Sequence, residues 1–173
     1  MFKRILIVAA GPLFNILLAV IIFYILLQIS GAMILKPTIG KVELDSPAFK
    51  GGLQKGDLVL AINESPVDSW DDMAALISES KGSALAIAVE REAEVKQLTV
   101  TPQIKTTKNI FGEDVQRFVI GIQSAGDVLE KKLTPLQAVT ESFVQTYTVA
   151  KLTVLSVVKL IQGSISTKTL GGP

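Results

Sequence analysis

The sequence contains no histidine and no cysteine, and each absence removes a class of chemistry. Without imidazole or thiol groups, this chain alone cannot form a Ser-His-Asp triad, a cysteine nucleophile, a disulfide or a zinc site built from His and Cys. The formal net charge is only +1 over 173 residues. Because nucleic-acid affinity depends on clustered Lys and Arg, we expect no nucleic-acid partner. The carboxylates of residues 37–102 form no convincing acid–base or metal cluster, and we assign no catalytic or metal-binding residue in this chain.

Charge is also missing from the run between Ile5 and Leu35. As a helix this run would reach about 46 Å, more than the roughly 30 Å of hydrocarbon in a bilayer. It predicts one transmembrane helix within residues 1–36. Lys3 and Arg4 precede the run and, by the positive-inside rule, place the N-terminus in the cytoplasm. The alternative is a cleaved signal peptide, whose apolar region is normally only about 7–15 residues long.

Three residues of this run, Gly11, Pro12 and Asn15, are unusual for a helix that faces only lipid. Small or helix-breaking residues in membrane helices usually mark close packing, and a polar amide needs a hydrogen-bonding partner. We therefore expect these residues to contact substrate or other helices of a membrane bundle. The alternative is a kink near the membrane surface in an isolated anchor.

Residues 37–102 contain short apolar segments separated by turn signals, as is typical of a small β-rich domain. The pattern predicts strands at Ile39–Val42 and Leu58–Ile62, an amphipathic helix with Met73, Leu76 and Ile77 on its inner face, and an antiparallel pair of strands over 85–101. We expect the second strand to be buried on both faces.

The pieces Pro37-x-Ile39-Gly40-x-Val42, Ser46-Pro47-Ala48 and Gly52-Leu53-x-x-Gly56-Asp57 follow in this order, and residues 37–102 resemble a bacterial PDZ domain. The resemblance implies peptide capture at an exposed strand edge, beside a helix that supplies an apolar wall. The groove would be lined by Ile39, Gly40, Lys41, Val42, Met73, Leu76 and Ile77. Alternatively, the three helix residues form only the core face of their helix.

Residues 103–133 are expected to be a linker, centred on 105–109, and one added strand over 117–122. Thr134-Pro135 then predicts the start of a long helix over 134–163. Its apolar residues recur every three or four positions, but Glu141, Lys151 and Lys159 would be costly at mid-membrane. We therefore expect an amphipathic helix at the lipid surface or against a membrane bundle, and not a second span. Docking on the β-rich domain is the alternative.

The order of the whole chain resembles the central region of a bacterial site-2 protease, of the regulator of sigma-E protease group. The resemblance is carried by Ala10-Gly11-Pro12-Leu13-x-Asn15, one PDZ-like domain, the long helix and Ser166-x-Lys168-x-Leu170-Gly171-Gly172-Pro173. It implies an α+β membrane protein of the bacterial inner membrane, with one N-terminal transmembrane helix, a periplasmic PDZ-like domain and a long C-terminal amphipathic helix. The implied activity is intramembrane zinc-dependent proteolysis of membrane-anchored proteins such as anti-sigma factors.

The zinc ligands of that family lie in a His-Glu-x-x-His helix ahead of this region and in an Asp of a later span. Neither motif occurs in this sequence. The resemblance therefore implies zinc in the full-length family member and none bound by this chain, which alone would be inactive. We expect residues 164–173 to lead to a further span of a longer protein.

On this interpretation the chain supplies a bundle helix and a PDZ gate to regulated intramembrane proteolysis. One alternative is a complete membrane-tethered PDZ adaptor that binds peptide C-termini without catalysis. Another is an inner-membrane component of a secretion system, which also combines one span with a PDZ-like domain.

Overall fold

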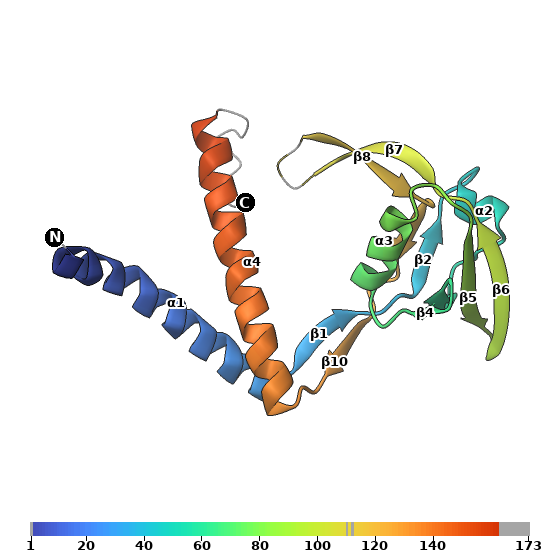
Figure 1. The fold of residues 1–173 in the computed structure, drawn as a ribbon. Coiled ribbons are helices and arrows are strands. Elements are labelled where there is room, and N and C mark those ends of the chain that lie inside the picture. The colour runs from blue at the N-terminus through green and yellow to red at the C-terminus, as the bar shows by residue number, and fades with distance from the viewer. Residues whose placement is uncertain (1, 110, 112, 163–173) are drawn as a thin grey trace. The chain divides into compact units, whose positions relative to one another are not determined.

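The chain forms two compact units in the computed structural model, which describes residues 2–109, 111 and 113–162 (Figure 1). Unit 1 comprises Met1–Ala32 and Glu130–Pro173, and unit 2 comprises Met33–Leu129. The boundaries fall in β1 (Ala32–Leu35) and β10 (Val128–Lys131), which pair as a two-stranded sheet. The expected loop over 164–173 lies outside the described residues.

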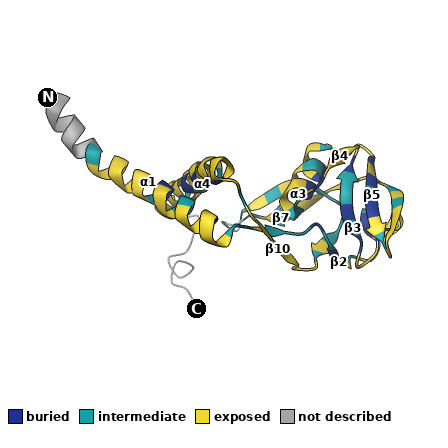
Figure 2. Ribbon diagram, turned by 90° about the horizontal axis from the view of Figure 1, so that it is seen from below, coloured by how far each residue is buried: buried dark blue, intermediate teal, exposed yellow. Residues whose placement is uncertain are grey.

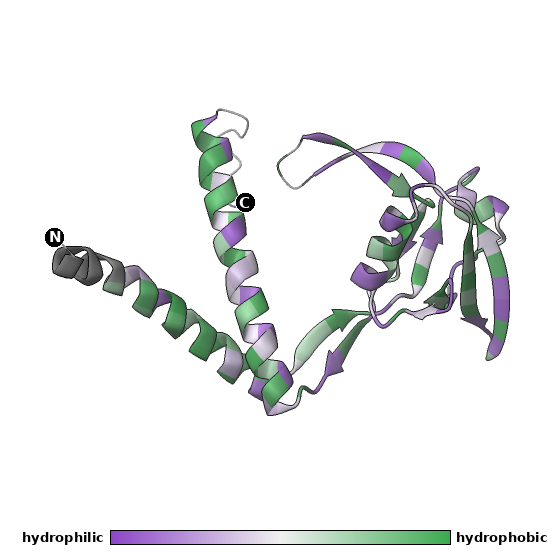
Figure 3. Cartoon of the chain, in the orientation of Figure 1, coloured by the Kyte–Doolittle hydropathy of each residue, from purple (hydrophilic) through white to green (hydrophobic). Residues whose placement is uncertain are grey.

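Unit 1 contains two long helices, α1 (Phe2–Ser30) and α4 (Pro135–Ile161). By length and composition, Ala10–Ser30 and Pro135–Ile161 are both apolar enough to cross a membrane, and Figure 3 shows the apolar residues along both helices. At 1.5 Å per residue, Ala10–Ser30 would span about 32 Å. Helix α1 stops before the end of the uncharged run, because Gly31 adopts φ +70 and the chain continues as strand β1.

Helix α4 begins at the predicted position: Thr134 is its N-cap and Pro135 its first residue. The face that α4 buries consists of small and polar residues, Ala138, Ser142 and Thr146, spaced one turn apart. The Ser142 and Thr146 hydroxyls donate to carbonyls of their own helix, at 2.7 and 2.8 Å, so they pack without an unmet polar group. Among residues 10–30 of its neighbour α1, Val20 and Leu27 are buried.

The apolar stripe of α4 lies outside this contact. Ser142 is 0% exposed, whereas the adjacent Phe143 is 58% exposed. The exposed large apolar residues of α4 include Leu136, Val139, Phe143, Tyr147, Val154, Val157 and Ile161. Figure 2 shows exposed residues along most of the described length of both helices. Within unit 1, then, the amphipathic helix packs through its small residues and presents its apolar face outward.

Unit 2 is built mainly of antiparallel strands. Its largest sheet has the order β4-β3-β5-β6, formed by β4 (Ser65–Pro66), β3 (Leu58–Ile62), β5 (Leu85–Arg91) and β6 (Glu94–Val100). Two further pairs are β2 (Ile39–Val42) with β9 (Ile122–Ser124), and β7 (Gln103–Lys108) with β8 (Asp114–Val119). Helices α2 (Pro47–Lys50) and α3 (Trp70–Glu79) complete the unit.

Strand β5 supplies the centre of the core, and its alternation follows the sequence prediction: Leu85, Ile87 and Val89 are buried. Strand β3 departs from the prediction, since only Val59 and Ile62 are fully buried. The register of β3 against β5 shifts between Val59 and Ala61. A β-bulge of this kind changes the side-chain alternation, so two residues three positions apart both face the core.

The segment 103–133 is more ordered than a linker. Most of 105–109 belongs to β7, which pairs with β8 over its full length. The expected single strand over 117–122 is divided into β8 and β9, because Gly121 adopts φ +80. A Cβ atom at Gly121 would lie 2.4 Å from the Ser46 Cβ, so both the dihedral angle and the space require glycine there.

An ion pair between a buried aspartate and a half-buried arginine connects the loop before β3 to the end of β5. Asp57 is 0% exposed, and its carboxylate accepts hydrogen bonds from Arg91 Nε at 2.6 Å and Nη2 at 2.8 Å. The same carboxylate accepts the Gln54 N–H at 2.8 Å, and Arg91 also donates to the Gly52 carbonyl. The hydrogen bond to Asp57 raises the pKa of the Arg91 guanidinium above its usual value. The pair is bidentate, the strongest geometry for such a contact.

Strand β2 has partners on two sides. The Ile39 N–H donates to the Asp57 carbonyl at 2.8 Å, while Lys41 and Val42 lie opposite Gln123 and Ile122 of β9. At Gly40 the register of this pair shifts, and a Cβ atom there would lie 2.6 Å from the Ala125 Cα and from the Ser124 carbonyl oxygen. Glycine at this position therefore allows the close approach of β9.

Replacing Arg91 with alanine is expected to destabilise unit 2 by about 3 kcal/mol, because it leaves the Asp57 carboxylate buried without its cation. The fluorescence of the single tryptophan, Trp70, reports unfolding of this unit in urea, with the full chain in detergent. Lys96→Ala is the control, since Lys96 pairs with Glu94 at the surface and should cost no more than about 0.5 kcal/mol. Equal midpoints for the two variants would contradict the structural role of the pair.

Gly40→Ala is expected to cost at least about 1 kcal/mol in the same assay, because the atoms that crowd the new methyl group belong to backbone. Lys41→Ala, at the exposed neighbouring position, should leave the midpoint unchanged. A Gly40→Ala protein of full stability would show that β9 does not approach β2 closely.

Candidate functional site

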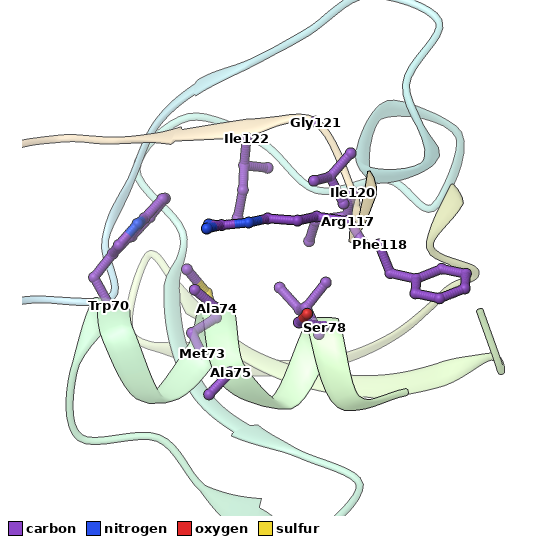
Figure 4. Close-up of a pocket in the computed structure, with 12 residues that line it drawn as sticks. Trp70, Met73, Ala74, Ala75, Ser78, Arg117, Phe118, Ile120, Gly121 and Ile122 are labelled. Atoms are coloured by element: carbon purple, nitrogen blue, oxygen red, sulfur yellow. The ribbon is translucent and has the colours of Figure 1, made fainter. Parts of the chain in front are cut away.

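A pocket of unit 2 lies between α3 and the segment 117–122, and we name it the α3–β8 pocket (Figure 4). Its volume is about 370 Å³. The lining residues from α3 are Trp70, Met73, Ala74, Ala75, Ile77 and Ser78, and those opposite are Arg117, Phe118, Val119, Ile120, Gly121 and Ile122.

The helical wall of the pocket is anchored in the core. Ser69 is the N-cap of α3, and its hydroxyl accepts the Asp72 N–H at 3.0 Å. Met73 and Ile77 are buried and belong to the hydrophobic core of unit 2, while Ala74 is exposed. Met73 and Ile77 therefore act as core residues and also line the apolar floor of the pocket.

The opposite wall is held by backbone hydrogen bonds. The Ile120 carbonyl accepts the Ala48 N–H at 2.8 Å, and the Gly121 carbonyl accepts the Glu43 N–H at 2.9 Å. In the described part of the chain, β8 has β7 as its one strand neighbour. The other edge of β8 is therefore available for an added strand, as in peptide recognition by β-augmentation.

The structure divides the residues predicted for the groove. Met73 and Ile77 line the α3–β8 pocket, and Leu76 is half-buried against the core. The strand Ile39–Val42 does not line it: Ile39 is buried in the core, and the strand is paired with β9. The second wall of this pocket is the segment 117–122, for which the sequence predicts only an added strand. Its signal was the apolar series Phe118 to Ile122, but nothing in the sequence placed this series beside α3.

The residues predicted for contacts within a membrane lie on the surface of α1. Gly11, Pro12 and Asn15 are exposed, and nothing lies within 4 Å of a Cβ atom built at Gly11. Among the described residues there is no cluster of three His, Cys, Asp or Glu side chains that could hold a metal ion. The described residues thus include the α3–β8 pocket and the exposed apolar face of α4, but no cluster of side chains that could hold a metal ion.

Curated relatives match this chain almost from end to end. A protein of Agrobacterium fabrum is 32% identical over 100% of this chain and 47% of its own length. Zinc metalloprotease RasP of Geobacillus kaustophilus is 31% identical over 99% of this chain and 38% of its own length. Metalloprotease MmpA of Caulobacter vibrioides is 25% identical, with 98% of this chain and 43% of its own length covered. The chain spans about half the length of these relatives, or less.

The solved structures that resemble the chain include PDZ domains of SdrC-like proteins. The domain from Listeria monocytogenes has a TM-score of 0.40 and 20% identity, with 50% of this chain and 84% of that domain covered. The domain from Listeria innocua has a TM-score of 0.41 and 22% identity, over 51% of this chain and 92% of that domain.

The family comparison covers the whole sequence. The model of peptidase family M50, the site-2 protease family, matches residues 1–173. The match includes both helices and the β-rich unit, and the chain therefore belongs to peptidase family M50.

Proposed function

We propose that this chain is part of an intramembrane zinc metalloendopeptidase and contributes one bundle helix and the substrate-gating domain to regulated intramembrane proteolysis. The observation that carries the proposal is the match of the complete chain, α1 and unit 2 together, to peptidase family M50. The residues present do not fit a zinc site, because the sequence has no His or Cys and the described carboxylates form no cluster. The zinc ligands of the full-length protein would therefore come from sequence other than these 173 residues.

The proposed location is the bacterial inner membrane, with α1 spanning it and unit 2 in the periplasm. Lys3 and Arg4 support a cytoplasmic N-terminus. The exposed Gly11, Pro12 and Asn15 support packing of α1 against further helices, since an amide in hydrocarbon requires a hydrogen-bonding partner. We propose that Asn15 contacts substrate or the catalytic bundle.

Unit 2 would receive membrane-anchored protein substrates, of which anti-sigma factors are one class. The α3–β8 pocket supports this role, because it combines an apolar helical wall with a strand that has a free edge. The same pocket also supports the alternative function, a membrane-tethered PDZ adaptor that binds peptide C-termini without catalysis. The protease requires zinc ligands in the full-length protein and the adaptor does not, so the presence or absence of these ligands distinguishes the two functions.

Helix α4 would lie at the lipid surface beside α1. Its small residues are used against α1, and its apolar stripe is exposed within unit 1. The polar residues Gln137, Glu141 and Thr148 lie on a third face of the helix, apart from the face that contacts α1 and from the apolar stripe. Lys151 and Lys159 are long enough to extend toward lipid headgroups.

The protease proposal is tested by sequencing the gene on both sides of this segment and expressing the complete protein. We expect an in-frame His-Glu-x-x-His motif upstream, stoichiometric zinc, and cleavage of a membrane-anchored model substrate that stops when the Glu of that motif is replaced by Gln. An uninterrupted gene that starts at Met1 and stops after Pro173 would exclude proteolysis and favour the adaptor.

The position of α4 is tested with single-cysteine variants, which are unambiguous because the native chain has no cysteine. A fluorophore attached at Phe143→Cys should be quenched by nitroxide-labelled lipid in proteoliposomes, and one at Thr148→Cys much less. Both positions are exposed in unit 1 and differ by about 140° around the helix. Equal quenching would indicate a lipid-surrounded span, and absence of quenching would indicate docking on protein.

A further inference from the structure

We propose that Arg117 selects an acidic side chain from an extended peptide bound in the α3–β8 pocket. The inference rests on the proposed capture of peptides by this pocket and adds the chemical class of the ligand. That class is a peptide in which a Glu or Asp lies between apolar residues.

Arg117 is the one charged residue among the 12 that line the pocket. Its side chain is exposed, and it takes part in none of the hydrogen bonds or ion pairs found among the described residues. A peptide that covered this guanidinium would remove its water, and an uncompensated buried charge is strongly unfavourable. A ligand that brings an anionic group to this position would compensate the charge.

The β7–β8 pairing places a second cation directly opposite. Arg117 and Lys105 are partners in the register of the hairpin, and like charges at such a pair are destabilising. Glu43 compensates Lys105, with 3.0 Å between the Lys105 Nζ and the Glu43 carboxylate. No carboxylate among the described residues pairs with Arg117 in this way, so the guanidinium can pair with a carboxylate of a ligand.

The direction of the Arg117 side chain fits this role. In Figure 4 it extends from the strand wall across the pocket, with its nitrogen atoms toward the side where Trp70 stands. A guanidinium binds a carboxylate through two parallel N–H bonds, and the aromatic ring gives the peptide an apolar surface beside that contact. The rest of the lining is mainly apolar, including Met73, Ile77 and Ile120.

An extended peptide would present its side chains to the pocket at alternate positions. A strand added at the free edge of β8 keeps the two-residue period, so every second side chain faces the same way. One of these positions would meet Arg117 and its neighbours would meet the apolar lining. This predicts selectivity for a charge at one position of the peptide and tolerance elsewhere.

The test measures binding to the full chain in detergent through the fluorescence of Trp70, the single tryptophan, which stands at the pocket. The probes are short peptides of alternating valine and serine, acetylated and amidated at their ends, with Glu, Gln or Lys at the centre. We expect the Glu peptide to bind at least about fivefold more tightly than the Gln peptide at low salt. High salt should reduce this difference.

Arg117→Gln should abolish the preference for Glu while leaving affinity for the Gln peptide unchanged, and Arg117→Glu should transfer the preference to the Lys peptide. Lys41→Gln is the matched control: Lys41 is an exposed cation on strand β2, outside the pocket, and this variant should keep the preference. Urea midpoints equal to wild type verify that each variant is folded.

Equal affinity for the Glu and Gln peptides in the wild-type chain, or a preference that survives Arg117→Gln, would overturn the inference. So would loss of the preference in Lys41→Gln instead. A version of the Gln peptide with a free C-terminus is included. If it alone binds, and does so through Arg117, the pocket recognises a terminal carboxylate and the side-chain assignment is wrong. Because binding is measured without zinc or cleavage, failure here leaves the proteolytic proposal to be decided by its own experiment.

Discussion

The buried pair of Asp57 and Arg91 is the contact on which the arrangement of unit 2 depends. Its carboxylate fixes the loop before β3 through Gln54 and joins it to the end of β5 through Arg91. The backbone carbonyl of the same aspartate accepts the Ile39 N–H, which positions β2. Strand β2 in turn pairs with β9, and β9 continues from the segment that forms one wall of the pocket. The ion pair is thereby connected, through β2 and β9, to one wall of the pocket. Because the Asp57 carboxylate is fully buried, removal of its partner carries a large penalty.

The contact between the two helices of unit 1 buries small residues of α4 and not its large apolar ones. In water a helix buries its apolar face, but α4 buries Ala138, Ser142 and Thr146 and leaves larger apolar residues exposed. Lipid provides no hydrophobic drive for helices to associate, so membrane helices pack through small residues that allow close approach. The hydroxyls are satisfied within the helix, so the contact with α1 requires no polar partner. The burial pattern of α4 is therefore the pattern expected of a helix that packs in or beside a bilayer.

The elements of the chain could largely be predicted from the sequence, whereas their spatial neighbours could not. The β5 alternation and the Thr134-Pro135 helix start are local signals, set by side-chain period and capping chemistry. The bulge in β3 was missed because a register shift depends on the partner strand. The groove was assigned to Ile39–Val42 from the resemblance to a PDZ domain, whereas the pocket beside α3 is lined by 117–122. Gly40 illustrates the difficulty: the sequence predicted it only as a groove residue, whereas in the structure the close approach of Ala125 requires glycine there.

The two walls of the α3–β8 pocket differ in how firmly they are supported. Helix α3 contributes Met73 and Ile77 to the core, whereas β8 belongs to a two-stranded hairpin, an element that is only marginally stable by itself. The Lys105–Glu43 ion pair supports this hairpin, but exposed pairs contribute little. A peptide that added a strand to β8 and also contacted α3 would bind only the assembled pocket, and by mass action would stabilise the hairpin. Binding of the selected peptide would then also order the β7–β8 hairpin. The guanidinium that selects the ligand lies on this hairpin, which is the less stable of the two walls and is therefore stabilised more by the peptide.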